Sequence, residues 1–137
     1  MNAYIDASVL LRLLFSENDA LAEWKTIKLG FSSRLIKLEI ERVIDRQRLI
    51  GKIDDAEVVS IHRECARVLQ ALRIVPITEL ILANAGAAMP TVLGSLDSIH
   101  LATALEVERA LGSKPTLATH DKQLAASAIA RGFTVIG

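Results

Sequence analysis

Ala3-Tyr4-Ile5-Asp6-Ala7-Ser8-Val9-Leu10-Leu11 is a short β-type segment that leads at once into an apolar helical pattern. The same β type recurs along the chain, at Asn2–Ile5, Leu29–Ser32, Arg73–Ile77, Thr116–Thr119 and Phe133–Ile136. Stretches with helical periodicity, rather than hairpin turns, separate these segments. The alternation predicts an α/β fold, a three-layer α/β/α sandwich around a central parallel sheet of four to five strands.

The helices are expected at roughly 7–16, 18–27, 33–50, 54–72, 78–89, 96–111 and 121–131. Gly51, Gly112 and Gly132 are placed as C-terminal stops, and Pro115 opens the fourth strand. A length of 137 residues without linker or repeat predicts a single domain over residues 1–137. Folds of this class generally bind ligands beyond the carboxyl ends of the strands, and the site is expected there.

The composition favours a core of Leu, Ile, Val and Ala, because 51% of the residues are hydrophobic and only 4% are aromatic. The single cysteine, Cys65, lies at helical spacing with Ile61 and Val68, which predicts a small core residue and a reducing, cytoplasmic compartment. The first residues lack the basic-then-apolar pattern of a signal peptide and are expected to belong to the fold. The charge-free stretch 80–96 is interrupted by glycine and proline, so no membrane association is expected.

Charge is distributed unevenly although the formal net charge is zero. Between Lys25 and Lys52 there are eight Lys or Arg residues and only three Asp or Glu residues. A basic region of this kind can mark a phosphate-binding face. A solvated helix surface explains it equally well, so charge alone does not identify a nucleic-acid partner.

Three aspartates stand where a helix is expected to start. Asp6 and Asp121 directly follow the first and fourth predicted strands, at the carboxyl edge of the sheet, and Asp97 comes early in the helix that starts near Ser95. Each has a purely structural alternative, since an aspartate at a helix start caps free N–H groups and complements the helix dipole.

Glu39 does not fit such an alternative. The helix predicted over 33–50 carries an apolar stripe at Leu35, Ile36, Ile40, Val43 and Ile44. The period of 3.6 residues puts Glu39 inside this stripe, whereas Glu41 points away and can pair with Lys37. A buried glutamate requires a partner or a metal ion. A buried ion pair with Arg42 or with another arginine is the alternative to a functional role for Glu39.

Convergence of Asp6, Glu39, Asp97 and Asp121 would bring repelling charges together unless a cation lay between them. Oxygen ligands without a supporting cysteine or a pair of histidines favour Mg²⁺ or Mn²⁺ over Zn²⁺. A divalent ion held by carboxylates can activate water and stabilise the charge that develops on a phosphodiester. The four acids therefore predict a nuclease or phosphohydrolase.

Four fragments together resemble the PIN domain, and specifically the VapC-type toxins of bacterial and archaeal toxin–antitoxin pairs. They are Tyr4-Ile5-Asp6-Ala7-Ser8-Val9-Leu10, Leu38-Glu39-Ile40-Glu41-Arg42, Leu96-Asp97-Ser98-Ile99-His100-Leu101-Ala102-Thr103-Ala104 and Ala118-Thr119-His120-Asp121. The resemblance implies a Mg²⁺- or Mn²⁺-dependent endoribonuclease and a parallel sheet in strand order 3-2-1-4-5. It also implies a homodimer and a cognate antitoxin protein whose C-terminal segment lies over the active site.

The resemblance also assigns roles to single residues. Three near-invariant acids of the family match Asp6, Glu39 and Asp97, and a fourth, more variable acid matches Asp121. Ser8 and Thr119 fall where such domains place a hydroxyl beside the metal-binding acids.

Other residues keep two interpretations. Arg42 can contact RNA phosphate or neutralise Glu39. His100 shares an inward face with neighbouring apolar residues, which favours a packed histidine bonded to the backbone over a catalytic or metal-binding one. Trp24 is interpreted as a packing or interface residue rather than a base-stacking platform. Two other functions stay open: a non-catalytic binding module with a PIN fold, and a Mg²⁺-dependent phosphohydrolase acting on small molecules. The RNA substrate is not identified.

Overall fold

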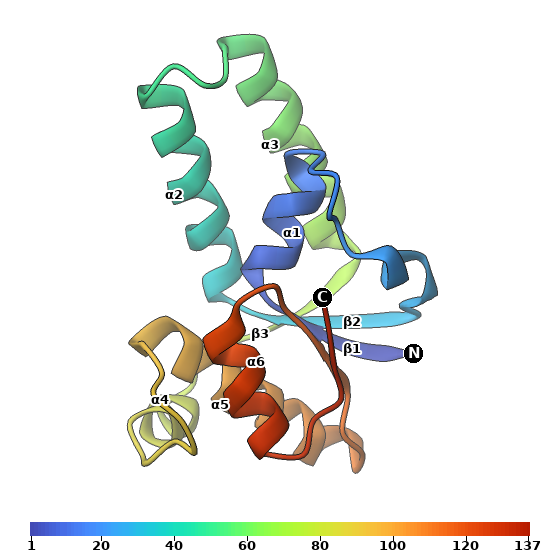
Figure 1. Cartoon of the computed structure of the whole chain (residues 1–137), viewed down its shortest axis with the longest axis vertical. Coiled ribbons are helices and arrows are strands. Elements are labelled where there is room, and N and C mark those ends of the chain that lie inside the picture. The colour runs from blue at the N-terminus through green and yellow to red at the C-terminus, as the bar shows by residue number, and fades with distance from the viewer.

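A five-stranded parallel sheet lies between two layers of helices in the computed structural model, which describes residues 1–137 (Figure 1). The strand order is β3-β2-β1-β4-β5, as expected, and every neighbouring pair is parallel. The strands are β1 (Asn2–Ile5), β2 (Leu29–Ser33), β3 (Leu72–Val75), β4 (Thr116–Ala118) and β5 (Val135–Ile136). The order 3-2-1-4-5 puts β1 beside β4, so Asp6 and Asp121 follow adjacent strands.

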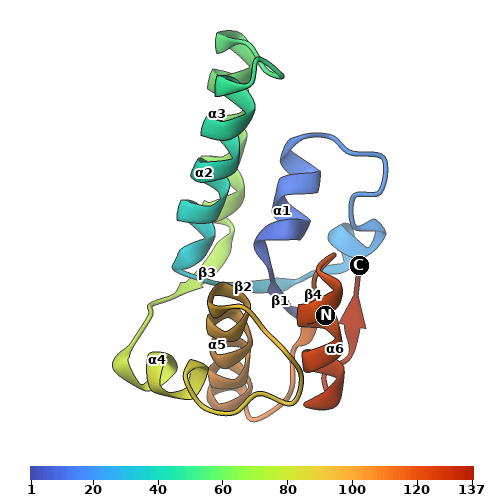
Figure 2. The ribbon, with the colours of Figure 1, turned by 60° about the vertical axis from the view of Figure 1, so that its left-hand side comes forward.

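The helices divide into two groups of three (Figure 2). One face of the sheet carries α1 (Ala7–Leu14), α2 (Leu35–Leu49) and α3 (Asp55–Gln70), and the other carries α4 (Glu79–Ala85), α5 (Ser95–Leu111) and α6 (Lys122–Ala130). Successive strand residues point to opposite faces of a sheet. Ile5 therefore packs in the apolar core under α1 to α3, while Tyr4 packs in a second core with α5 and α6.

The helix α2 stands almost upright on the sheet and forms with α3 a hairpin that projects well beyond it (Figures 1 and 2). Its buried residues are Ile36, Ile40 and Ile44, as the sequence pattern predicted. Gly51 has a φ of +75° in the connecting turn, a conformation that favours glycine. A capping box between Asp54 and Glu57 then starts α3. The turn and the capping box thus reverse the chain direction between the two helices.

The helix predicted over 18–27 is wrong, because only a short 3-10 helix, η1 (Ala22–Thr26), forms there. Asn18 and Asp19 favour turns rather than a helix interior, and Asp19 forms an ion pair with Arg12 of α1. The helix predicted over 78–89 ends at Ala85, because Gly86 and Pro90 follow. The third, fourth and fifth strands are also shorter than expected. None of the helices has both the length and the apolar character needed to cross a membrane.

The burial of Ile40 gives the first prediction. Ile40 has no exposed surface, whereas Leu49 on the same helix is 66% exposed. We expect Ile40→Ala to lower the free energy of unfolding by about 2–5 kcal/mol, because it leaves a cavity in the core under α2. Leu49→Ala, the control, should change it by less than about 0.5 kcal/mol. Urea unfolding measures both values, and equal effects would contradict this packing of α2.

Candidate functional site

The four predicted acids line one pocket of about 370 Å³ at the carboxyl ends of β1 and β4. Asp6 joins β1 to α1, Glu39 lies near the start of α2, Asp97 lies in the first turn of α5 and Asp121 immediately precedes α6. The structure thus brings all four together from segments that are far apart in the sequence. Arg42 and Arg46 also line the pocket, and Arg46 was not among the residues singled out from the sequence.

The carboxylate of Asp6 is buried and is held through one oxygen. The hydroxyls of Ser8 and Thr119 donate hydrogen bonds to its Oδ2 at 2.6 and 2.9 Å, and the Ser8 N–H donates at 3.3 Å. Its Oδ1 makes none of these bonds. The structure therefore places both predicted hydroxyls on one oxygen of Asp6, while the other oxygen, Oδ1, lies 3.5 Å from His100 Nε2.

The same hydroxyls are fixed from the other side of the pocket. The N–H of His120 donates to Ser8 Oγ at 2.9 Å, and the N–H of Asp121 donates to Thr119 Oγ1 at 2.9 Å. Because both hydroxyls use their protons toward Asp6 and accept from the β4–α6 connection, their orientation is determined. This network joins the end of β1 rigidly to the start of α6.

Asp6 and Asp121 each cap a helix and also line the pocket. Asp121 Oδ1 accepts from the N–H groups of Gln123 and Leu124 at 2.8 and 2.9 Å, which caps α6, and Asp6 caps α1. The cap of α6 uses only Oδ1. Asp121 Oδ2 therefore stays available at the pocket, so one side chain both starts a helix and contributes a carboxylate oxygen.

Glu39 faces inward, with 17% of its side chain exposed. Arg42 does not pair with it, since the Arg42 guanidinium contacts Asp45 at 3.1 Å. The alternative of a buried Glu39–Arg42 ion pair is therefore wrong. Glu41 is on the solvent side, as expected, 3.7 Å from Lys37.

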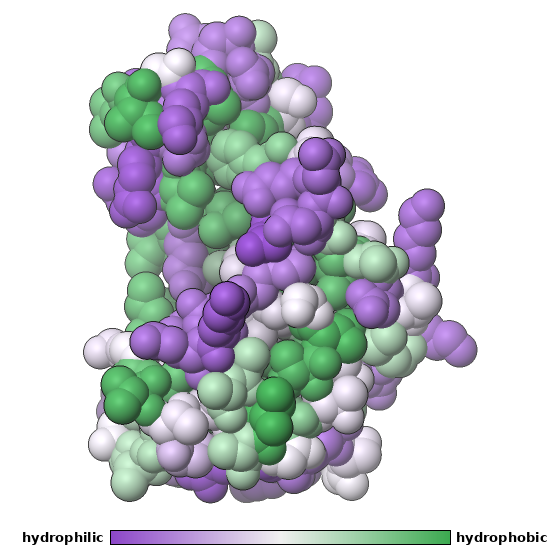
Figure 3. Space-filling model, viewed as in Figure 1, coloured by the Kyte–Doolittle hydropathy of each residue, from purple (hydrophilic) through white to green (hydrophobic).

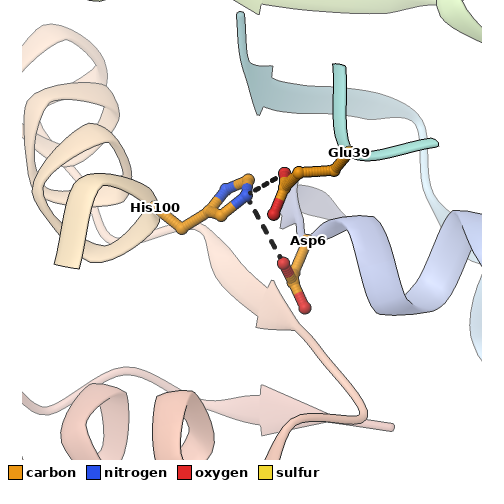
Figure 4. A group of neighbouring side chains, drawn as sticks. All are labelled: Asp6, Glu39 and His100. Atoms are coloured by element: carbon orange, nitrogen blue, oxygen red, sulfur yellow. Dashed lines mark hydrogen bonds and ion pairs between the residues drawn. The ribbon is translucent and has the colours of Figure 1, made fainter. Parts of the chain in front are cut away.

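The partner of Glu39 is His100, which has no exposed surface. Its Nε2 lies 2.7 Å from Glu39 Oε2 and 3.5 Å from Asp6 Oδ1 (Figure 4). Its Nδ1 lies 2.8 Å from the Tyr4 Oη. The expectation that His100 bonds to the backbone is wrong, because both ring nitrogens meet side chains. One sequence signal could have placed His100 near the acids. It follows Asp97 by three residues, which puts both side chains on one face of the helix.

The pocket disfavours further negative charge. The pKa of Asp97 is raised to about 6, first by burial and then by the charges of Asp121, Asp6 and Glu39, which outweigh the opposing effect of His100. Burial alone would lower the pKa of His100, but the hydrogen bond to Glu39 and the neighbouring carboxylates raise it. Four crowded carboxylates with free oxygens fit a hard divalent cation such as Mg²⁺ or Mn²⁺.

A histidine nitrogen also lies close enough to two of the carboxylates to be a possible metal ligand. One ligand atom each from Asp6, Glu39 and His100 lies within 4.8 Å of the others. Asp6 and Glu39 of this group line the pocket together with Asp97 and Asp121, whereas His100 lies buried behind them.

Comparison with known proteins gives concordant results. The family model described as PIN domain matches residues 3–130. Ribonuclease VapC47 of Mycobacterium tuberculosis is 32% identical over 137 aligned positions, which cover 95% of this chain and 92% of that protein. The crystal structure of Mycobacterium tuberculosis VapC20, described as a Sarcin-Ricin loop cleaving toxin, superposes with a TM-score of 0.66 at 16% identity and covers 96% of both chains. A toxin–antitoxin complex from Klebsiella pneumoniae has a TM-score of 0.63 at 20% identity and covers 90% of both chains.

The raised pKa of Asp97 predicts a pH-dependent stability in metal-free protein. Its folded pKa of about 6 exceeds the ordinary 3.8, so its stabilising contribution is complete at low pH and is lost as the pH rises through this interval. Asp97→Asn, which stays neutral, should therefore melt at a higher temperature than the wild type near neutral pH, and the difference should shrink toward about pH 4.

Thermal melting with a chelator present measures this difference. Asp55→Asn is the control, because it removes an exposed carboxylate at the start of α3, outside the pocket. A gain for Asp97→Asn that does not change with pH, or a loss of stability at neutral pH, would contradict the crowding of charges described above.

Proposed function

The chain belongs to the PIN domain family, and from this membership we propose that it is a Mg²⁺- or Mn²⁺-dependent endoribonuclease, the toxin of a toxin–antitoxin pair. One observation carries the proposal: four carboxylates from four distant segments line a single pocket beside two arginines. Relatives named as VapC ribonucleases support the reaction. A pocket of unbalanced negative charge supports the metal ion.

Asp6, Glu39, Asp97 and Asp121 are the residues that would hold the cation. A bound divalent ion supplies Lewis acidity, which lowers the pKa of water and stabilises negative charge on a phosphodiester. The chain's own contribution is orientation. Ser8 and Thr119 hold Asp6 through Oδ2 and aim Oδ1 at the pocket.

The RNA would approach along α2. Arg42 and Arg46 are one turn apart on this helix, and both line the pocket. Arg42 shares its charge with Asp45, whereas Arg46 forms no ion pair with a carboxylate of the chain. A guanidinium can bind phosphate through two hydrogen bonds. Arg46 is therefore the stronger candidate for holding the RNA backbone against the acids.

The proposed partners are RNA, a cognate antitoxin protein and a second copy of the chain. The solved toxin–antitoxin complex with the same fold supports the antitoxin. Apolar side chains reach the surface in the layer of α4, α5 and α6, where Figure 3 shows green patches. Leu80, Leu82, Val92 and Leu96 are exposed there. Exposed apolar surface of this kind supports a protein interface.

A matched pair of glutamates on α2 tests the assignment. Glu39→Gln should reduce the rate of Mg²⁺-dependent RNA cleavage by at least about 100-fold, because it removes a charged ligand and keeps the side-chain size. Glu41→Gln changes an exposed residue two positions away and should leave the rate close to the wild type. Cleavage of total RNA, with mapping of the cut ends, measures both.

The same assay separates the other functions. Cleavage of nucleotides or phosphomonoesters without cleavage of RNA would favour a small-molecule phosphohydrolase. Metal-independent association with RNA or protein, with no cleavage of either substrate class, would favour a binding module. Undiminished cleavage by Glu39→Gln would refute the proposed ligand set.

The position of Arg46 leads to a prediction about RNA binding. Arg46→Ala should weaken binding of single-stranded RNA and reduce the slope of log affinity against log salt concentration by about 0.7, the loss of one phosphate contact. Binding is measured by fluorescence anisotropy in the Glu39→Gln background, where RNA stays intact. Arg67→Ala, on α3 and outside the pocket, is the control. An unchanged salt slope for Arg46→Ala would place the RNA elsewhere.

A further inference from the structure

A buried chain of three side chains connects both helical layers through the end of the sheet. Tyr4 lies in β1, His100 in α5 and Glu39 in α2. Tyr4 and His100 have no exposed surface, and the two contacts between their polar atoms measure 2.8 Å from Tyr4 Oη to His100 Nδ1 and 2.7 Å from His100 Nε2 to Glu39 Oε2. The imidazole ring stands edge-on to the Tyr4 ring, with an interplanar angle of 72°.

The hydrogen bonds among Tyr4, His100 and Glu39 determine where the protons of these side chains lie. The phenol of Tyr4 has no exposed surface, so its proton needs an acceptor within the protein. In a neutral His100 the acceptor is Nδ1, which leaves the ring proton on Nε2, facing Glu39. In a charged His100 both nitrogens carry protons, and Nε2 again faces Glu39 as a donor. The remaining tautomer would set the Nε2 lone pair against an ionised carboxylate.

We propose that His100 is a positioning residue: its Nε2–H holds the Glu39 carboxylate at the pocket, and Tyr4 fixes the ring that does so. The proposal rests on the metal site of the proposed function and assigns His100 a place outside the ligand set. A nitrogen that carries a proton has no lone pair for a metal ion. His100 thus acts on the cation through Glu39, although its Nε2 lies close enough to both carboxylates to be taken for a ligand.

Glu39 needs such a partner more than the other acids do. Asp6 and Asp121 have short side chains and are fixed by hydrogen bonds from their own helix starts. Glu39 has three rotatable side-chain bonds, and His100 is the residue that hydrogen-bonds to its carboxylate. Without that bond the carboxylate can turn toward solvent, and the ordering would have to be supplied when a cation binds.

Two amide variants, each of which can replace one ring nitrogen of His100, separate a positioning role from a packing role. In His100→Gln the amide nitrogen can take the place of Nε2 and donate to Glu39, whereas His100→Asn reaches only as far as Nδ1. We expect His100→Asn to weaken Mn²⁺ binding by about 10- to 100-fold and His100→Gln to stay within a few-fold of the wild type. Calorimetric titration with Mn²⁺ alone measures the affinity, and circular dichroism checks that both variants fold.

A double-mutant comparison tests whether His100 acts through Glu39. Once Glu39→Gln has removed the ionised acceptor, adding His100→Asn should cause little further loss of Mn²⁺ affinity. A loss of Mn²⁺ affinity in the double variant that equals the sum of the losses in the two single variants would overturn the proposal. So would equal losses in His100→Gln and His100→Asn, because that result indicates a role in packing only.

The tautomer can be observed without any variant. Nitrogen NMR of the metal-free protein should show a proton on His100 Nε2. Electron paramagnetic resonance of the Mn²⁺-loaded protein should show no directly coordinated imidazole nitrogen. An unprotonated Nε2, or nitrogen coordination to Mn²⁺, would overturn the proposal.

These measurements do not depend on RNA cleavage. If the wild type binds Mn²⁺ with the predicted dependence on His100 but cleaves no RNA, the nuclease function fails and the positioning role stands. If it cleaves RNA while His100→Asn binds Mn²⁺ like the wild type, the positioning role fails and the nuclease function stands.

Discussion

Electrostatic repulsion among four carboxylates is the constraint that this structure must satisfy, because they crowd into one pocket at the end of a parallel sheet. The chain meets it with hydrogen-bond donors that hold three of the acids through one carboxylate oxygen each. Two hydroxyls bind Asp6, the first N–H groups of α6 bind Asp121, and a buried imidazole binds Glu39. Asp97 has the least compensation, and accordingly it has the pKa that is raised to about 6. Free oxygens and unrelieved charge together make the pocket a site for a cation.

The strand β1 supplies the geometry on which this arrangement depends. Tyr4 points into the core beneath α5, Ile5 into the core beneath α1 to α3, and Asp6 leaves the strand at its carboxyl end. Three consecutive residues thus fix the two layers and the pocket relative to each other. Since β1 lies between β2 and β4, the segments after all three strands come together at this end of the sheet. The position of the acids follows from the strand order rather than from contacts among the acids themselves.

Much of this was predictable from the sequence. Glu39 was identified because a charged residue in the apolar stripe of an amphipathic helix requires a reason to be there. The strand order came from family resemblance, because residue patterns identify strands but do not order them. The Glu39–His100 contact was missed, since it joins residues 61 positions apart across two layers. The helix predicted over 18–27 does not form, and the periodicity of apolar residues gave no sign of the ion pair between Arg12 and Asp19, which favours a turn.

The double use of Asp6 and Asp121, as helix caps and as pocket acids, has an evolutionary consequence. Loss of a capping carboxylate costs a protein about 0.5–2 kcal/mol, so a change at either position weakens the fold as well as the chemistry. Asp97 caps no helix and can be replaced without that penalty, whereas replacement of Glu39 leaves the buried His100 Nε2–H without its acceptor. Lineages that discard the activity while keeping an intact fold should therefore lose Asp97 first and retain the two capping aspartates longest.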